Sequence, residues 1–329
     1  MLTFLLKRLA QLLIVMLAIS FIAFAIQSKL GDPVAQMSGM MTSNAEKELL
    51  RERMGLNDPF LSQYGRYLSN IVTAGDFGDS YFLKRPTLEL ILQALPATLE
   101  LVLASSFIVI GLSIPLGIYA AIHPRNWLTK IIMGISTVGI SIPVFLTAIL
   151  LLFVFSQWLG WLPSYGRGET VAFFGGALSL GILTWDGFLH LILPAIALST
   201  IMLPLFIRLV RSEMMESLGQ EYIRFARAKG LPKRKIYYRH ALKNTMLPVI
   251  TVGGVQLGTM IAYTILTERV FEWPGMGNLF LEAINRADIP LITTYIVFVG
   301  FIFVMTNTIV DLIYGLIDPR VSIGGGKAK

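Results

Sequence analysis

Six stretches of the chain are apolar over a length that matches the hydrocarbon core of a lipid bilayer. They are Leu9–Ile26, Ala97–Ile122, Ile131–Leu159, Phe188–Val210, Met246–Leu266 and Leu291–Ile317. A membrane helix needs about 20 apolar residues to cross about 30 Å of hydrocarbon. Each stretch is predicted to be helical, because lipid offers no hydrogen-bond partner to backbone N–H and C=O groups. The pattern predicts an all-α, polytopic membrane protein with six transmembrane helices.

The amino-acid composition supports this prediction. Of the 329 residues, 55% are hydrophobic and 14% are charged, whereas about 25% are charged in ordinary soluble domains. The mean hydropathy is +0.69. So few charges cannot cover a soluble core of this size, and a disordered chain is excluded for the same reason. Cysteine is absent, which excludes a disulfide framework, a thiol nucleophile and a zinc–thiolate site.

The distribution of Lys and Arg sets the predicted orientation. With the amino terminus in the cytoplasm, the two shorter outer loops carry only Arg167, Arg269 and Arg286, and most other basic residues are cytoplasmic. Membrane proteins retain positive charge on the cytoplasmic side, so both termini are predicted to be cytoplasmic. The net charge of +7 is then a topology signal, and nucleic-acid binding is not needed to explain it.

The first apolar stretch has features of a signal peptide. Lys7 and Arg8 form a charged start, and Ala23-Phe24-Ala25 has the small-residue pattern of a cleavage site. The apolar run is nevertheless longer than the core of a usual signal peptide. We therefore interpret this stretch as an uncleaved membrane anchor.

The chain divides into four predicted parts. Residues 1–27 form an N-terminal transmembrane helix, and residues 28–96 form a segment outside the membrane. Residues 97–320 form the transmembrane core, which includes a cytoplasmic loop at residues 211–245. Residues 321–329 form a cytoplasmic tail.

The outer segments carry turn and helix signals. In the first, a helix is predicted near Ala45–Met54, with turn signals at Gly31-Asp32-Pro33 and Asp58-Pro59. The second, residues 160–187, is rich in glycine and is predicted to be a loop. A Pro-Gly pair in the third, residues 268–290, forces a turn.

The cytoplasmic loop at residues 211–245 has the signals of two short helices. A first helix is predicted to end at Gly230, because glycine suits a left-handed helix cap. Pro232 is predicted to open the second helix, where its missing N–H costs nothing.

One face of the first short helix combines apolar residues with surrounding positive charge. Tyr222, Phe225 and Ala226, with the stem of Lys229, recur at helical spacing. The basic residues around them are Arg224, Arg227, Lys229, Lys233, Arg234 and Lys235. This combination predicts a docking element for a partner protein. The alternative is a loop that only sets topology and touches lipid headgroups.

Four blocks, in order along the chain, resemble one family of transporters. They are Gly55-Leu56-Asn57-Asp58-Pro59 with Gln63-Tyr64 and residues 75–80; Tyr222–Leu231 with Arg239–Asn244 and Leu247-Pro248; Phe271–Gly277; and Asp311–Arg320. Together these blocks resemble the permeases of binding-protein-dependent ABC importers, in the B-type of the dipeptide and oligopeptide family. The resemblance covers essentially the whole chain, which makes it far more specific than any one block.

Three residues of the cytoplasmic block differ from the pattern of importer permeases in general, and they narrow the resemblance to the peptide-type permeases. Arg224 and Phe225 replace the usual first Glu-Ala of the cytoplasmic block, and Lys243 stands where a proline is usual. Peptide-type permeases share these changes. The glycine-rich tail is not a phosphate-binding loop, because Val321 and Ala328 occupy positions that require Gly and Ser or Thr.

The resemblance implies a fold, a location and a set of partners. The fold is that of a type I ABC importer permease in the bacterial cytoplasmic (inner) membrane, with residues 28–96 in the periplasm. The implied partners are a second homologous permease, two cytoplasmic ATPase subunits, an extracytoplasmic peptide-binding protein and the lipid bilayer. The chain is expected to be a transport subunit and not an enzyme. It is expected to hold no cofactor, with ATP and Mg on the partner subunits.

Two sets of site residues follow from the resemblance. The residues expected to couple the chain to an ATPase are Glu221, Arg224, Phe225, Ala226, Arg227, Ala228, Lys229 and Gly230. The residues of the outer turn expected to face the binding protein are Trp273, Pro274, Gly275 and Gly277. No residue is assigned to substrate binding or to a metal.

The function implied is that of half the translocation path of an ATP-driven di- and oligopeptide importer. The same scaffold imports nickel chelates, glutathione or peptide-like compounds in relatives, and no residue here reports the cargo. A self-contained secondary transporter would need inverted repeats and an ion site at mid-membrane, neither of which the sequence shows. A membrane enzyme is disfavoured, because His123, His190 and His240 lie far apart and no catalytic motif accompanies them.

Polar residues inside the predicted spans are functional candidates by default. Glu100 lies near an outer end and Asp311 near an inner end; we interpret both as structural, bonded to neighbouring helices, with a role on the path left open. Arg208 lies at a span end and is interpreted as reaching the interface. The G-x-x-x-G at Gly254–Gly258 permits close helix packing, within this chain or against the partner permease.

Overall fold

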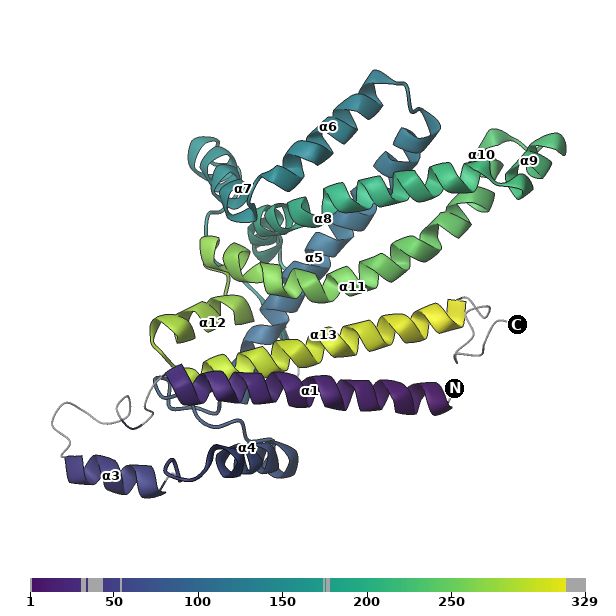
Figure 1. Ribbon diagram of the computed structural model, residues 1–329. Helices are drawn as coiled ribbons and strands as arrows, with labels where there is room; N and C mark the ends of the chain where they lie inside the picture. The colour runs from purple at the N-terminus through teal and green to yellow at the C-terminus, as the bar shows by residue number, and fades with distance from the viewer. Residues whose placement is uncertain are drawn as a thin grey trace. The chain divides into compact units, whose positions relative to one another are not determined.

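The computed structural model describes residues 2–30, 34, 44–53, 55–173, 175 and 178–317, which are mostly helical (Figure 1). In chain order the helices are α1 (Leu2–Leu30), α3 (Asn44–Arg53), α4 (Phe60–Ala74), α5 (Thr87–Ile122), α6 (Trp127–Ser141), α7 (Val144–Leu151), the π-helix η1 (Leu152–Trp158), α8 (Trp185–Gly219), α9 (Glu221–Ala228), α10 (Lys233–Lys235), the π-helix η3 (Ile236–Ala241), α11 (Leu242–Val270), α12 (Met276–Asn285) and α13 (Ile289–Ile317). The strands β1 (Val171–Phe173) and β2 (Leu178–Leu180) pair antiparallel, with Val171 opposite Leu180. The predicted all-α class is confirmed, and this hairpin is the exception to it.

The chain folds into two compact units, each built from two separate parts of the sequence. The first comprises Met1–Pro96 and Gly275–Met305, and the second comprises Ala97–Pro274 and Thr306–Lys329. The turn predicted at Gly31-Asp32-Pro33 lies outside the described residues, as does the predicted tail.

In the first unit, α1 and α13 lie side by side (Figure 1). Gly300 permits this contact, because a Cβ built there would lie 2.7 Å from Ile19 Cδ1. Helix α4 packs against α1: the rings of Phe21 and Tyr64 have centroids 5.3 Å apart, and the Tyr64 hydroxyl lies 2.8 Å from Ser20 Oγ. Helix α3 confirms the helix predicted near Ala45–Met54, whereas α4 was not predicted.

In the second unit, α8 packs against α6, α7 and α11. Close packing depends on glycine at two points. A Cβ at Gly117 of α5 would lie 2.6 Å from Val210 Cβ of α8. A Cβ at Gly254 of α11 would overlap the side chain of Val310 of α13. The G-x-x-x-G pattern is therefore used at Gly254 for packing within this chain.

Four described helices are long and apolar enough to cross a membrane: Thr87–Ile122, Trp185–Gly219, Lys233–Val270 and Ile289–Val310. The pair formed by α6 and α7–η1 could supply a fifth span, and α1 contains the shorter apolar helix Ala10–Ile26. Six spans and cytoplasmic termini therefore stay predictions. Helices α5 and α8 extend beyond their apolar stretches, because helical geometry continues into more polar flanking sequence.

The stretch Ile131–Leu159, predicted as one span, is broken in the middle. Helices α6 and α7 are bent by 108° relative to one another. The break falls at Ile142, whose backbone is extended (φ −91°, ψ 122°), and Pro143 then precedes the first turn of α7. A proline disfavours helical geometry in the residue before it, which accounts for the position of the break.

Candidate functional site

The cytoplasmic loop has the backbone that its sequence predicts around Gly230. Helix α8 ends before Gln220, whose extended backbone (ψ 154°) separates it from α9. Gly230 follows α9 with φ +74°, and its N–H donates to Arg227 O at 2.9 Å. Pro232 directly precedes α10, as predicted. The left-handed turn at Gly230 thus fixes the angle between the two short helices.

The buried face of α9 differs from the predicted one. Ile223 is fully buried and Ala226 is 6% exposed, whereas Phe225 is 63% exposed. Ile223 and Ala226 are three residues apart, so they share one side of the helix, and α9 packs against α8 and η3. Ala226 is therefore buried within this chain and not on the exposed side of α9, and its part in coupling stays a prediction.

Tyr222 connects the short helix to two long ones. Its hydroxyl lies 2.6 Å from Ser217 Oγ of α8 and accepts a hydrogen bond of 2.8 Å from Asn244 Nδ2 of α11. Ser217 Oγ in turn donates to Ala241 O at 3.2 Å. A displacement of α9 would therefore be transmitted to both α8 and α11.

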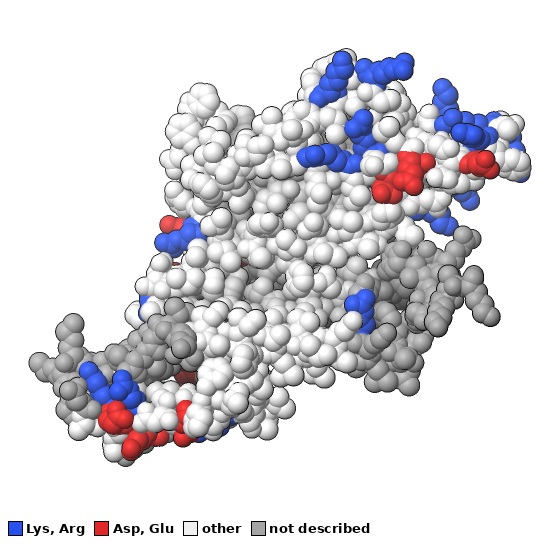
Figure 2. Space-filling view, viewed as in Figure 1, with Lys and Arg blue, Asp and Glu red and all other residues white. Residues whose placement is uncertain are grey.

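The exposed side of the loop presents an aromatic ring among cations. The Lys229 ammonium lies 4.5 Å from the centroid of the Phe225 ring, which is cation–π geometry. The other exposed site residues predicted here are Glu221, Arg224, Arg227, Ala228, Lys229 and Gly230. Figure 2 shows Lys and Arg side chains gathered over the end of the molecule that carries α9 and α10. An exposed aromatic anchor with a positive rim is typical of a protein-docking surface.

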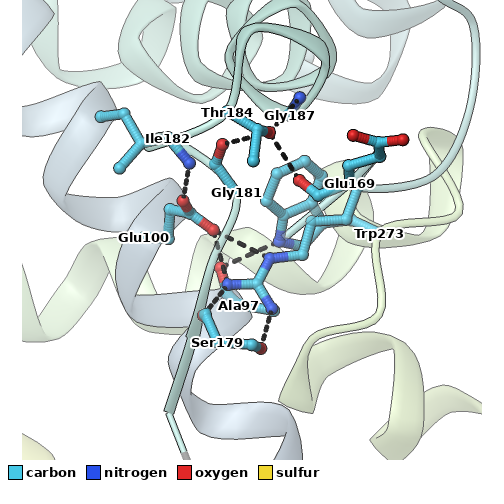
Figure 3. Close-up of polar contacts among 10 residues, drawn as sticks. Ala97, Glu100, Glu169, Ser179, Gly181, Ile182, Thr184, Gly187 and Trp273 are labelled. Carbon is cyan, nitrogen blue, oxygen red and sulfur yellow. Dashed lines mark hydrogen bonds and ion pairs between the residues drawn. The ribbon is translucent and has the colours of Figure 1, made fainter. Parts of the chain in front are cut away.

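On the opposite, predicted outer side, Glu100 of α5 forms a buried ion pair with Arg167 of the loop that contains the hairpin (Figure 3). Glu100 is 6% exposed and Arg167 is 8% exposed. Glu100 Oε2 accepts from Arg167 Nε at 2.8 Å and from Nη2 at 2.6 Å, and Oε1 accepts from Ile182 N at 2.5 Å. Glu100 therefore has a structural role, as predicted, but its partners belong to a loop and not to a neighbouring helix.

Arg167 also holds the hairpin itself. Its Nη1 donates to Ser179 Oγ at 2.9 Å and its Nη2 donates to Ser179 O at 2.5 Å. A buried charge is tolerated when it is paired and its remaining donors are bonded. Arg167 was not predicted to be a site residue. A partial signal was available, because an acid inside an apolar span needs a cation and the outer loop at residues 160–187 offers only this one.

Trp273 belongs to the same buried cluster. It is 0% exposed, its Nε1 donates to Ala97 O at 2.9 Å, and the Arg167 guanidinium lies 5.9 Å from its ring. An indole buries a large apolar area and satisfies its N–H with one acceptor, which favours this inward position. Of the four residues predicted to face a binding protein, only Pro274 is exposed, and Gly275 and Gly277 are buried. Trp273 therefore supports the turn from within, and contact of the turn with a binding protein stays a prediction.

Other polar candidates have separate positions. Glu268 is fully buried and accepts from Thr98 Oγ1 at 2.7 Å. Arg208 is exposed. The side chain of Asp311 lies outside the described residues. Among the described residues, no three His, Cys, Asp or Glu side chains are grouped so that they could hold a metal ion.

The arrangement of helices is that of an ABC importer permease. It matches a solved structure of the MetNI methionine ABC transporter in an inward-facing conformation, with a TM-score of 0.55 and 16% sequence identity. The match covers 70% of this chain and 97% of the other. At that identity the likeness concerns the fold alone.

Sequence comparison identifies the family. Residues 113–323 match the model of the binding-protein-dependent transport system inner membrane component, and residues 1–102 match the model of its N-terminal region. The chain belongs to this family. It is therefore a multi-pass protein of the bacterial cytoplasmic membrane that works with other components of an ABC transporter.

Individual relatives match the chain from end to end. It is 38% identical to the dipeptide transport system permease protein DppB of Alkalihalophilus pseudofirmus and 36% identical to the oligopeptide transport system permease protein AppB of Bacillus subtilis. It is 35% identical to the dipeptide transport system permease protein DppB of Escherichia coli. Each match covers 98% of this chain and 99% of the relative.

Proposed function

We propose that this chain is the permease subunit of an ATP-driven importer of di- and oligopeptides. The observation that carries the proposal is the end-to-end match to permeases named for dipeptide and oligopeptide transport. The chain would form half of the translocation path with a second homologous permease. Two cytoplasmic ATPases would supply energy, with ATP and Mg on those subunits, and an extracytoplasmic binding protein would deliver the peptide.

The exposed surface around Phe225 supports a defined role in coupling. The ring would enter a groove on the ATPase, and Arg224 and Arg227 would meet acidic residues at the rim of that groove. When ATP closes the ATPase pair, the docked helix α9 moves with it. Because Tyr222 bonds to both Ser217 and Asn244, this movement would reach α8 and α11 together. The different contacts made in inward- and outward-facing states would carry the coupling energy.

A growth experiment in the native host tests the transport function. In a proline auxotroph, deleting the gene for this chain should abolish growth on a proline-containing dipeptide and leave growth on free proline unchanged. Restoring the gene should restore growth. Unimpaired growth and uptake on the dipeptide, in a strain with no second peptide importer, would contradict the proposal.

A further inference from the structure

A polar pocket lies in the first unit. Its volume is about 420 Å³. It is lined by residues of α4, by the loop that follows α4, and by the start of α13: Tyr67, Asn70, Asp76, Phe77, Gly78, Asp79, Ser80, Tyr81, Lys84 and Pro290. The loop contains residues 75–80, which belong to one of the four blocks that resemble the transporter family and to the segment predicted to lie outside the membrane.

The loop that forms this pocket is held in one conformation by a buried acid. Asp288 is 2% exposed, and its carboxylate accepts from Ser80 Oγ and from the backbone N–H of Tyr81 at 3.1 Å. Thr87 Oγ1 donates to Gly78 O at 2.9 Å on the other side of the loop. A rigid loop with this many anchors is suited to binding, because little conformational freedom remains to be lost.

Two features of the pocket are unfavourable for the free chain. Lys84 has φ +53°, a left-handed backbone that non-glycine residues rarely adopt. The Tyr67 hydroxyl is shut off from solvent and has no hydrogen-bond partner among the described residues. Burial also raises the pKa of this phenol, so it stays protonated. Backbone strain such as that at Lys84 is found at functional sites more often than elsewhere.

The chemistry of the walls favours a cation. Asp76 and Asp79 are exposed carboxylates on the loop, and Lys84 supplies a single opposing ammonium. Tyr67, Phe77 and Tyr81 offer aromatic surface, on which a guanidinium stacks favourably. Asn70 offers a further polar group. Two carboxylates among aromatic rings fit the planar, many-donor head group of arginine.

We propose that this pocket receives an arginine side chain of the extracytoplasmic binding protein. The inference rests on the proposed function, which supplies such a partner on this side. The guanidinium pairs with Asp76 and Asp79, and its plane lies against the aromatic walls. A free peptide fits less well, because its own carboxylate would face two aspartates and one ammonium.

The test uses the complete transporter, reconstituted with its ATPases, second permease and peptide-loaded binding protein. The binding-protein concentration that gives half-maximal stimulation of ATP hydrolysis should rise about tenfold in Asp76→Asn/Asp79→Asn. Basal hydrolysis should not change. The matched control is Glu52→Gln, which removes one exposed carboxylate from α3 of the same outer segment and should leave the half-maximal concentration unchanged.

A second variant guards against a purely structural effect. Phe77→Leu keeps an apolar side chain of similar size but removes an aromatic wall, so thermal stability should stay close to that of the wild type while docking weakens several-fold. Wild-type half-maximal concentrations in both variants would overturn the inference, as would loss of binding of the free dipeptide Ala-Ala with docking unchanged. If the wild-type complex were not stimulated by the binding protein at all, the proposed function would fail as well.

Discussion

At the scale of single residues, the glycine at position 230 is required by its backbone conformation and not by close packing. A Cβ at Gly230 would meet nothing within 4 Å, so its φ of +74° is the only reason for glycine. Gly230→Val should insert and fold, but the left-handed backbone costs a side-chain-bearing residue about 1–2 kcal/mol and the turn should change. Stimulation of ATP hydrolysis by loaded binding protein should then fall in the reconstituted complex.

The control for this substitution is Gly219→Val at the end of α8. Gly219 also has open space around it, and its backbone is not left-handed. This variant should retain stimulation at matched expression. Full stimulation in Gly230→Val would show that the loop geometry does not matter for coupling.

Phe225 is the residue expected to dominate docking of the ATPase. Because it is 63% exposed, Phe225→Ala should leave the unfolding temperature of this chain unchanged. An exposed aromatic anchor contributes about 2 kcal/mol or more at an interface, so affinity for the ATPase should fall about thirtyfold. Co-purification of the ATPase with the solubilised permease measures this. Met215→Ala, which truncates an exposed side chain of α8, should leave the affinity unchanged; equal retention in Phe225→Ala would contradict the docking role.

Substitutions at Ala226 and Ala228 are expected to show which side of α9 is needed for folding and which for docking. Ala226→Trp forces a large ring into the packed side of α9, and overpacking costs about 1–3 kcal/mol, so this chain should unfold at a lower temperature. Ala228 is exposed, so Ala228→Trp should keep the unfolding temperature and block ATPase binding by holding the surfaces apart. Thermal unfolding in detergent and ATPase co-purification distinguish the two. An unchanged unfolding temperature in Ala226→Trp would contradict the inward orientation of α9.

At the scale of elements, the Glu100–Arg167 pair joins a loop to a helix. Glu100→Gln leaves a buried guanidinium without its counter-charge, which costs about 3–5 kcal/mol. The double variant Glu100→Gln/Arg167→Met removes both charges and should recover much of that loss. Unfolding of the solubilised wild type, of Glu100→Gln, of Arg167→Met and of the double variant measures the coupling. The control is Glu89→Gln, whose pair with Arg85 is exposed and contributes at most about 1 kcal/mol. Additive single effects would contradict a direct pairing.

Long helices could be predicted from the sequence because lipid leaves no alternative for the backbone. The loop helix α9 and its end at Gly230 could be predicted for a local reason, since glycine and proline punctuate helices. The sequence could not distinguish the sharp break before Pro143 from a mild kink, because a proline can cause either one. The hairpin formed by β1 and β2 depends on Arg167 and its distant partner Glu100, so no short stretch of sequence encodes it.

The orientation of side chains was the least predictable part of the site. Ala226 and Phe225 are adjacent in sequence and both suit an apolar face, yet only the packing of α9 decides which one is buried. The burial of Trp273 was hard to predict for a similar reason, because its indole N–H bonds to Ala97, which is 176 residues away in the chain. Contacts over such separations follow from the fold and not from local pattern.

At the scale of the whole molecule, the predicted orientation can be tested by labelling. The chain contains no cysteine, so single cysteines introduce unique labels. Val72→Cys lies on exposed α4 and should react in intact spheroplasts, whereas Lys235→Cys in the cytoplasmic loop should react only after lysis. Reaction of both residues before lysis, or of Val72→Cys only after it, would contradict the orientation.

This chain is expected to move peptides only as part of an ATP-driven complex. The most direct measurement is uptake of labelled Ala-Ala into proteoliposomes that contain the chain with its second permease, ATPases and loaded binding protein. Uptake should require ATP, should stop when the ATPases are inactivated, and should be absent from liposomes that contain this chain alone. Uptake at the full rate by the chain alone, or by the complex without ATP, would contradict the account.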